Sequence, residues 1–236
     1  MKYLIVKTYL IGDFMKKNIF ILVFLVFICS NFSFSIQEAK EAFYLNQIKN
    51  YNNIEAMVSL ASLYYFQGKL ELAEKYYLMA ANYNNSAALY FLGDIYFKQE
   101  KVELAEKYFL IAANLDNSSA MNNLGFMYDE GNGVSQNYAK AKEWYTKAAS
   151  LGNRTAMRNL AYMYENGNGV SQNDKIAKEW YKKSEELGNS SAKTCLGITY
   201  AEGTGVTQSD KAAKELCEKA AESGNRTAMY NLGVRY

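Results

Sequence analysis

The chain has 236 residues, half of them hydrophobic, and it contains neither proline nor histidine. The lack of proline favours helix along most of the chain, because proline breaks helix interiors. The lack of histidine excludes catalytic systems that rely on a histidine base and removes the commonest zinc ligand, so we expect no metal and no cofactor.

The first 35 residues have the pattern of a secretory signal peptide. A basic start at residues 15–17 is followed by an apolar run at 19–29 and by small residues at Ser33 and Ser35. The run is shorter than the ~20 residues that a membrane span needs. We therefore expect residues 1–35 to be removed, leaving no membrane span, and the mature protein to be periplasmic or secreted, most naturally from a bacterium. An uncleaved N-terminal anchor is the alternative.

Removal of residues 1–35 takes away four Lys and one Asp, so the formal charge of +2 becomes −1. A nearly neutral chain with interspersed charges lacks the basic surface that nucleic acids attract. We expect no nucleic-acid partner.

A repeated segment begins after residue 50. One leucine per repeat recurs at spacings of 32, 32, 36, 36 and 36 residues, with Ala four positions before it, Ala or Gly directly after it and Tyr four positions after it. These leucines are Leu60, Leu92, Leu124, Leu160, Leu196 and Leu232. Positions four apart lie on one face of a helix, so each segment predicts an amphipathic helix.

A second helix is predicted in each repeat, at 71–81, 103–113, 140–150, 176–186 and 212–222. The small residue after the leucine would let the two helices of a pair approach closely. Residues 37–50 resemble a second helix, with Tyr44 where Tyr76 and Tyr108 stand, and we expect them to cap the array. The expected repeats are 55–86, 87–118, 119–154, 155–190 and 191–226, followed by a partial sixth repeat at 227–236.

The pattern AxxxLGxxYxxGxGVxxxxxKAxxWYxKAAxxGN recurs almost intact through residues 119–226. It resembles the Sel-one-like repeat family, a relative of the tetratricopeptide repeats. The resemblance implies an all-α fold, a right-handed superhelical solenoid of antiparallel helix pairs, and an adaptor role without catalysis. The pattern drifts in the fifth repeat, where Leu216 and Cys217 replace the Trp and Tyr of the repeats before it.

The G-x-G stretches of the three long repeats, such as Gly167 and Gly169, invite comparison with phosphate-binding loops. Each follows a predicted helix, whereas a phosphate loop follows a strand and opens a helix. We interpret the first glycine as a helix stop with positive φ and the second as part of the turn.

Segments with the Asn-x-Ser/Thr pattern of a glycosylation sequon recur where one repeat meets the next, for example at 117–119 and 153–155. Their periodic placement indicates a structural role. We expect the Ser or Thr to cap the following helix and the Asn to lie in the preceding turn.

A concave face lined by the first helices is the expected binding surface for a protein or peptide partner. By analogy with tetratricopeptides, the predicted groove residues are Tyr90, Asp94, Asn122, Phe126, Asp129, Arg158, Tyr162, Glu165 and Ile198. Exposed aromatics beside polar groups suit such a partner. The alternative is that these side chains pack against neighbouring repeats.

Cys195 and Cys217 are the cysteines left in the mature chain, both in the fifth repeat. A disulfide between them is one interpretation, since an exported protein can form one. Buried free thiols are the other, because the two Cβ directions need not converge.

A secreted β-lactamase-like or penicillin-binding enzyme is the alternative function, since some cysteine-rich bacterial relatives are described in this way. Ser190-x-x-Lys193 fits one motif of such enzymes, but no SDN follows and Lys193-Thr194-Cys195 is not KTG. The paired cysteines of those relatives are also missing. We therefore predict a scaffold with no catalytic residues.

Overall fold

The computed structural model describes residues 36–235, so the predicted signal peptide lies outside the described residues. Within the described part all regular structure is α-helix, as predicted. The chain divides into two compact units, one up to Tyr76 and one from Tyr77 onward. None of the described helices is both long and apolar enough for a membrane span.

Residues 36–51 form the first described helix. The helices that follow are α2 (Ile54–Phe66), α3 (Leu70–Ala81), α4 (Ser86–Lys98), α5 (Val102–Ala113), α6 (Ser118–Glu130), α7 (Tyr138–Ser150), α8 (Arg154–Asn166), α9 (Asp174–Glu186), α10 (Ser190–Glu202), α11 (Asp210–Glu222) and α12 (Arg226–Arg235). The boundary between the two units falls inside α3.

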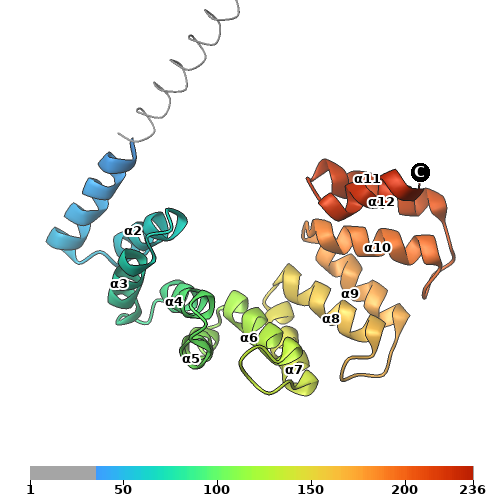
Figure 1. The fold of residues 1–236 in the computed structure, drawn as a ribbon, viewed down its shortest axis with the longest axis horizontal. Helices are drawn as coiled ribbons and strands as arrows, with labels where there is room; N and C mark the ends of the chain where they lie inside the picture. Colours follow the sequence, from blue (N-terminus) through green and yellow to red (C-terminus); the bar gives the residue numbers. More distant parts are fainter. Residues whose placement is uncertain (1–35, 236) are drawn as a thin grey trace, which may run out of the picture. The chain divides into compact units, whose positions relative to one another are not determined.

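The second unit is a stack of helix pairs. Helices α4 and α5, α6 and α7, α8 and α9, and α10 and α11 pack as pairs, and each second helix also contacts the first helix of the next pair. Figure 1 shows these pairs following one another along the unit. The repeated leucine lies at the centre of each pair and is buried in every one of them. The predicted solenoid of antiparallel helix pairs is therefore confirmed for this unit.

The small residue after each leucine makes room for a side chain of the second helix. A Cβ added to Gly125 would lie 2.5 Å from the ring of Tyr145, and one added to Gly93 would lie equally close to Phe109. These rings are buried. The close approach that the sequence predicted is thus an approach of a ring to the backbone of the facing helix.

An asparagine, and not the following Ser or Thr, caps each first helix. Asn117 accepts a hydrogen bond from the Ala120 N–H at 3.0 Å, and its side-chain amide donates to the Ser86 carbonyl of the preceding repeat at 3.1 Å. Asn153 repeats both bonds with Ala156 and Ser118. The prediction of a Ser or Thr cap is wrong, because asparagine carries both the acceptor for its own helix and a donor that reaches the neighbouring repeat.

The first unit uses a contact that recurs in the second. The Tyr64 hydroxyl donates to Glu41 at 2.6 Å, as the Tyr128 hydroxyl donates to Glu106 at 2.5 Å. Glu41 is therefore the counterpart of Glu106. This places Tyr44 where Phe109 stands, one position away from the alignment predicted from sequence.

The glycines of the long loops are structural, as predicted. Gly167 ends α8 in the left-handed region with φ 73°, and its N–H bonds the Met163 carbonyl. Gly169, also with positive φ, lies against Tyr138 at the start of the preceding second helix, and a Cβ there would overlap the Tyr138 side chain. The second glycine thus holds the loop on the neighbouring repeat.

Replacement of Gly169 by Ala should destabilise the protein more than replacement of Gly152. Both glycines have positive φ, but nothing lies within 4 Å of a Cβ at Gly152. We expect a loss of about 1–2 kcal/mol for Gly152→Ala from backbone strain alone, and at least about 1 kcal/mol more for Gly169→Ala from the added contact. Urea unfolding followed by circular dichroism measures both, and equal losses would contradict the assigned contact.

Candidate functional site

The predicted groove lies on the first helices of the second unit, α4, α6, α8 and α10. Phe126 and Tyr162 are exposed, with 41% and 48% of their surface accessible. Asp129 is buried, and the other predicted residues are half-buried: Tyr90, Asp94, Asn122, Arg158, Glu165 and Ile198. The structure therefore leaves almost half of the surface of two aromatic residues on this face open to solvent.

A pocket of about 210 Å³ lies between α4 and α6. It brings together the predicted residues Asp94 and Phe126. Its other lining residues are Phe97, Phe109, Asn123 and Met127. Phe109 and Met127 are core residues whose edges form the floor, and helical periodicity alone assigns them to the core and not to a site.

A chain of polar side chains links α6 to α8. The side-chain amide of Asn159 donates to the Asn122 side-chain oxygen at 3.1 Å, and an Arg158 guanidinium nitrogen donates to the Asn159 side-chain oxygen at 2.7 Å. These bonds fix the Arg158 guanidinium, and Tyr162 lies one helical turn further along α8. An arginine has five N–H donors, so this one bond leaves others for a ligand.

Asp129 and Glu165 accept hydrogen bonds from tyrosines inside their own repeats. The Tyr145 hydroxyl donates to Asp129 at 3.3 Å, and the Tyr181 hydroxyl donates to Glu165 at 2.7 Å. Burial raises the pKa of the Asp129 carboxyl, while the bond from Tyr145 acts in the opposite direction. Burial, together with the neighbouring carboxylate, holds the pKa of Tyr145 above its ordinary value. The structure thus assigns both acids the role of acceptor for a buried tyrosine.

The second and fifth repeats lack both the tyrosine and the acid of this pair. In the second repeat the tyrosine position holds Phe109 and the acid position holds Phe97, and in the fifth the same positions hold Cys217 and Ala201. The acid is absent where the hydroxyl is absent. This joint change between residues 16 apart in the long repeats is the sequence signal that could have identified the pair.

Cys195 and Cys217 are free thiols in this structure. Cys217 lies against Gly197 inside its own helix pair, whereas Cys195 lies within hydrogen-bonding reach of the Tyr181 hydroxyl of the preceding repeat. Burial raises the pKa of the Cys195 thiol. The two cysteines face different neighbours, and the disulfide stays a prediction.

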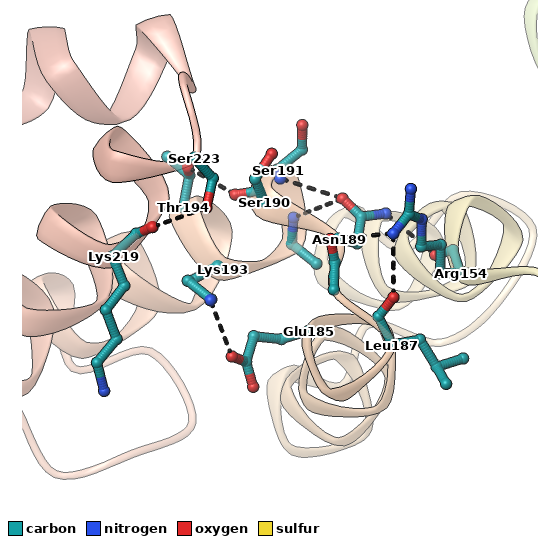
Figure 2. Close-up of polar contacts among 12 residues, drawn as sticks. Arg154, Glu185, Leu187, Asn189, Ser190, Ser191, Lys193, Thr194, Lys219 and Ser223 are labelled. Carbon is teal, nitrogen blue, oxygen red and sulfur yellow. Dashed lines mark hydrogen bonds and ion pairs between the residues drawn. The ribbon is translucent and has the colours of Figure 1, made fainter.

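Ser190 and Lys193, the partial match to a serine-enzyme motif, lie at the start of α10. Figure 2 shows the Lys193 side chain extending away from Ser190 and toward Glu185 of α9, with a nitrogen–oxygen distance of 3.3 Å. Nearby bonds join the start of α8 to the turn after α9: an Arg154 guanidinium nitrogen donates to the Leu187 and Gly188 carbonyls. The lysine is therefore engaged in an ion pair between helices.

No group of acidic or cysteine side chains in residues 36–235 has the arrangement of a metal site. The polar side chains of the groove, namely amide, guanidinium and carboxylate, are suited to hydrogen bonding with a bound partner. Such groups fix the orientation of a ligand, and apolar contacts supply most of the binding energy.

A family model described as the Sel1 repeat matches residues 54–84, 86–117, 118–153, 155–189 and 195–225. A Sel1 repeat protein from Oxalobacter formigenes has 28% sequence identity and a TM-score of 0.76, with 87% of this chain and 88% of that chain covered. No curated protein matches the chain.

The structure of c5321, a protective antigen of uropathogenic Escherichia coli with the same repeat fold, has 26% identity and a TM-score of 0.65. The match covers 85% of this chain and 49% of that one, so the present chain spans about half of the antigen's length. An immunity protein from Pseudomonas aeruginosa, Pa5087, has 20% identity and a TM-score of 0.57 over 77% of this chain and 72% of that one, and shares the fold.

The buried Asp129 carboxyl gives a prediction about pH. A carboxyl whose pKa is raised in the folded state stabilises the fold below its unfolded pKa, and this contribution is lost as the pH rises through the raised value. Relative to wild type, Asp129→Asn should gain stability above about pH 4, by about 1.4 kcal/mol for each unit of the pKa rise.

Unfolding free energies measured across the acid and neutral range would test this expectation. Asp116→Asn, which removes an exposed carboxylate in a turn, is the control. A difference between Asp129→Asn and wild type that does not vary with pH would contradict the assignment.

Proposed function

Because the chain belongs to the Sel1 repeat family, we propose that it is an exported, non-catalytic scaffold that binds a protein or peptide on the concave face of its first helices. Sel1 repeats form a scaffold for protein–protein interaction, and proteins built from them are generally non-catalytic. The fold itself does not identify a site, so the proposal depends on particular side chains.

The observation that carries the proposal is the pocket between α4 and α6 with Phe126 at its rim. Phe126 and Tyr162 keep almost half of their surfaces exposed, although they lie in consecutive repeats of a packed stack. Aromatic side chains of this kind, next to a pocket, are the usual anchors of a protein interface. The pocket is small enough for one apolar side chain of a partner.

Two polar residues outside the pocket, Asn122 of α6 and Arg158 of α8, suit the backbone or an acidic side chain of that partner. Asn122 and Arg158 are fixed by hydrogen bonds through Asn159, so little further ordering is needed when they bind. Less loss of conformational freedom means that more of the contact energy appears as affinity. We propose that Phe126, Tyr162 and Arg158 form the centre of the interface.

The alternative of a serine enzyme gains no support from the arrangement around α10. Lys193 would have to act as a base or hydrogen-bond partner for Ser190, but it forms an ion pair with Glu185. A nucleophile and its base need to lie within hydrogen-bond reach of each other.

The groove proposal predicts loss of a binding partner after three single changes. Phe126→Ala, Tyr162→Ala and Arg158→Ala should each weaken binding by roughly tenfold or more, as truncations of interface anchors do. Leu151→Ala and Leu187→Ala are matched controls, because these leucines lie in the turns between repeats and are 48% and 47% exposed, like Tyr162.

Affinity capture from envelope and secreted fractions, followed by titration of the purified partner, measures the effect. A partner that binds all five variants as it binds wild type would rule out the groove. A partner lost only with Leu151→Ala or Leu187→Ala would place the interface at the turns.

The export proposal is supported by the pattern of residues 15–35 and has its own test. Expression of the full chain in a Gram-negative host should give a periplasmic or secreted product that begins near Ile36. Replacement of residues 16 and 17 by Glu should retain the precursor in the cytoplasm. An unprocessed product in the membrane fraction would instead indicate an N-terminal anchor.

A further inference from the structure

A second pocket, away from the groove, lies between the second helices of the fourth and fifth repeats. Its volume is about 240 Å³. Its residues come from three helices: Lys178, Lys182 and Glu185 from α9, Leu196 and Tyr200 from α10, and Ala212, Glu215, Leu216 and Lys219 from α11. The buried Leu196 and the half-buried Leu216 give it an apolar floor.

The pocket occurs where the repeat pattern loses a tryptophan. The third and fourth repeats carry Trp144 and Trp180 at the position of Leu216. They also carry a lysine three residues later whose ammonium lies over the indole, 4.5 Å from the Trp144 ring and 4.4 Å from the Trp180 ring. In the fifth repeat Lys219 has the same position, but Leu216 offers no ring. The pocket therefore lies where an indole is missing and the cation that would cover it is present.

The charges around the pocket favour an anion. Three lysines and two glutamates line it; Glu185 is paired with Lys193 at 3.3 Å, and Lys182 is paired with Glu186 at 3.9 Å, so Lys178 and Lys219 face Glu215. Lys178 is held at the rim by the Tyr200 ring, 5.3 Å from its ammonium. Figure 2 shows Lys219, Lys193 and Glu185 extending on the same side of α10. Positive charge is thus in excess beside an apolar floor.

We infer that this pocket binds an aromatic carboxylate, with the ring in the space that tryptophan fills in the preceding repeats and the carboxylate among the lysines. The ring would receive the cation–π contact of Lys219 that Trp144 and Trp180 receive from their own lysines. The volume lies below the usual range for drug-sized ligands, so the occupant is one aromatic ring system of indole size or smaller with a short acidic arm. This site is independent of the groove.

Such a group has two sources, a free aromatic acid or the carboxyl end of a peptide that finishes in an aromatic residue. Indole-3-acetate is the probe for the first source. An N-acetylated peptide ending in tryptophan is the probe for the second, with its carboxamide as the uncharged control. We expect dissociation constants on the order of 0.1–1 mM for the better probe, since few atoms make contact.

The decisive variant is Leu216→Trp, which restores the residue of the two preceding repeats. It should fold as wild type, by circular dichroism and thermal melting, and lose at least tenfold in affinity in a ligand-observed NMR titration. Ala212→Ile, which copies Ile176 of the fourth repeat, fills the pocket in the same way and serves if Leu216→Trp does not fold. Undiminished binding to either folded variant would overturn the inference.

The lysines are tested separately. Lys219→Gln should weaken binding of the probe several-fold and reduce the dependence of its affinity on salt. Lys211 is an exposed lysine on α11 outside the pocket, so Lys211→Gln should change neither the affinity nor its salt dependence. Binding of indole-3-acetate alone indicates a small-molecule ligand, and tighter binding of the free-acid peptide than of its carboxamide indicates a peptide terminus. If neither probe binds the wild-type protein, the inference is wrong.

Discussion

One asparagine at each junction between repeats fixes the arrangement of the second unit. Its side-chain oxygen starts its own helix, and its side-chain nitrogen ties that start to the first residues of the preceding first helix, as in Asn117 and Asn153. Solenoids are stabilised by contacts between neighbours only. A cap and a hydrogen bond together contribute about 1–2 kcal/mol to each junction. Because this hydrogen bond joins equivalent positions of successive first helices, it keeps the exposed faces of those helices aligned.

That alignment decides which side chains can act together. Asn122 and Asn159 meet only because α6 and α8 start at matching heights, and their contact fixes Arg158 on the same face as Phe126 and Tyr162. Of the three acids on that face, Asp129 and Glu165 are held inward by tyrosines of the second helices, and Asp94 is paired with Lys98 of its own helix. The predicted groove therefore combines exposed aromatics with one arginine, and most of its polar groups are held by hydrogen bonds or ion pairs within the protein.

Much of the fold could be predicted from the sequence, because its determinants repeat. The leucine, the small residue after it and the loop glycines recur at regular spacing and do what their chemistry predicts. The asparagine cap was missed because Ser and Thr are also good caps, and only the structure shows that Asn153 bonds two repeats. The roles of Asp129 and Glu165 were missed because their partners lie 16 residues away on another helix. The loss of tryptophan at Leu216 was visible in sequence, but the pocket depends on the lysines that surround it.

The tyrosine–acid pairs formed by Asp129 and Glu165 lie within single repeats, whereas other polar contacts join two repeats. Tyr145 and Asp129 belong to one repeat, whereas Asn153 with Ser118 and Tyr128 with Glu106 join two. A gene duplication that copies a whole repeat preserves the first kind of contact and leaves the second kind to be met by whatever repeat becomes the neighbour. Asn117, Asn153 and Asn189 bond backbone carbonyls, which every neighbour provides, so a copied long repeat with such an asparagine can join the array wherever it is inserted. Such an array can lengthen or shorten by whole repeats while each keeps its own interior.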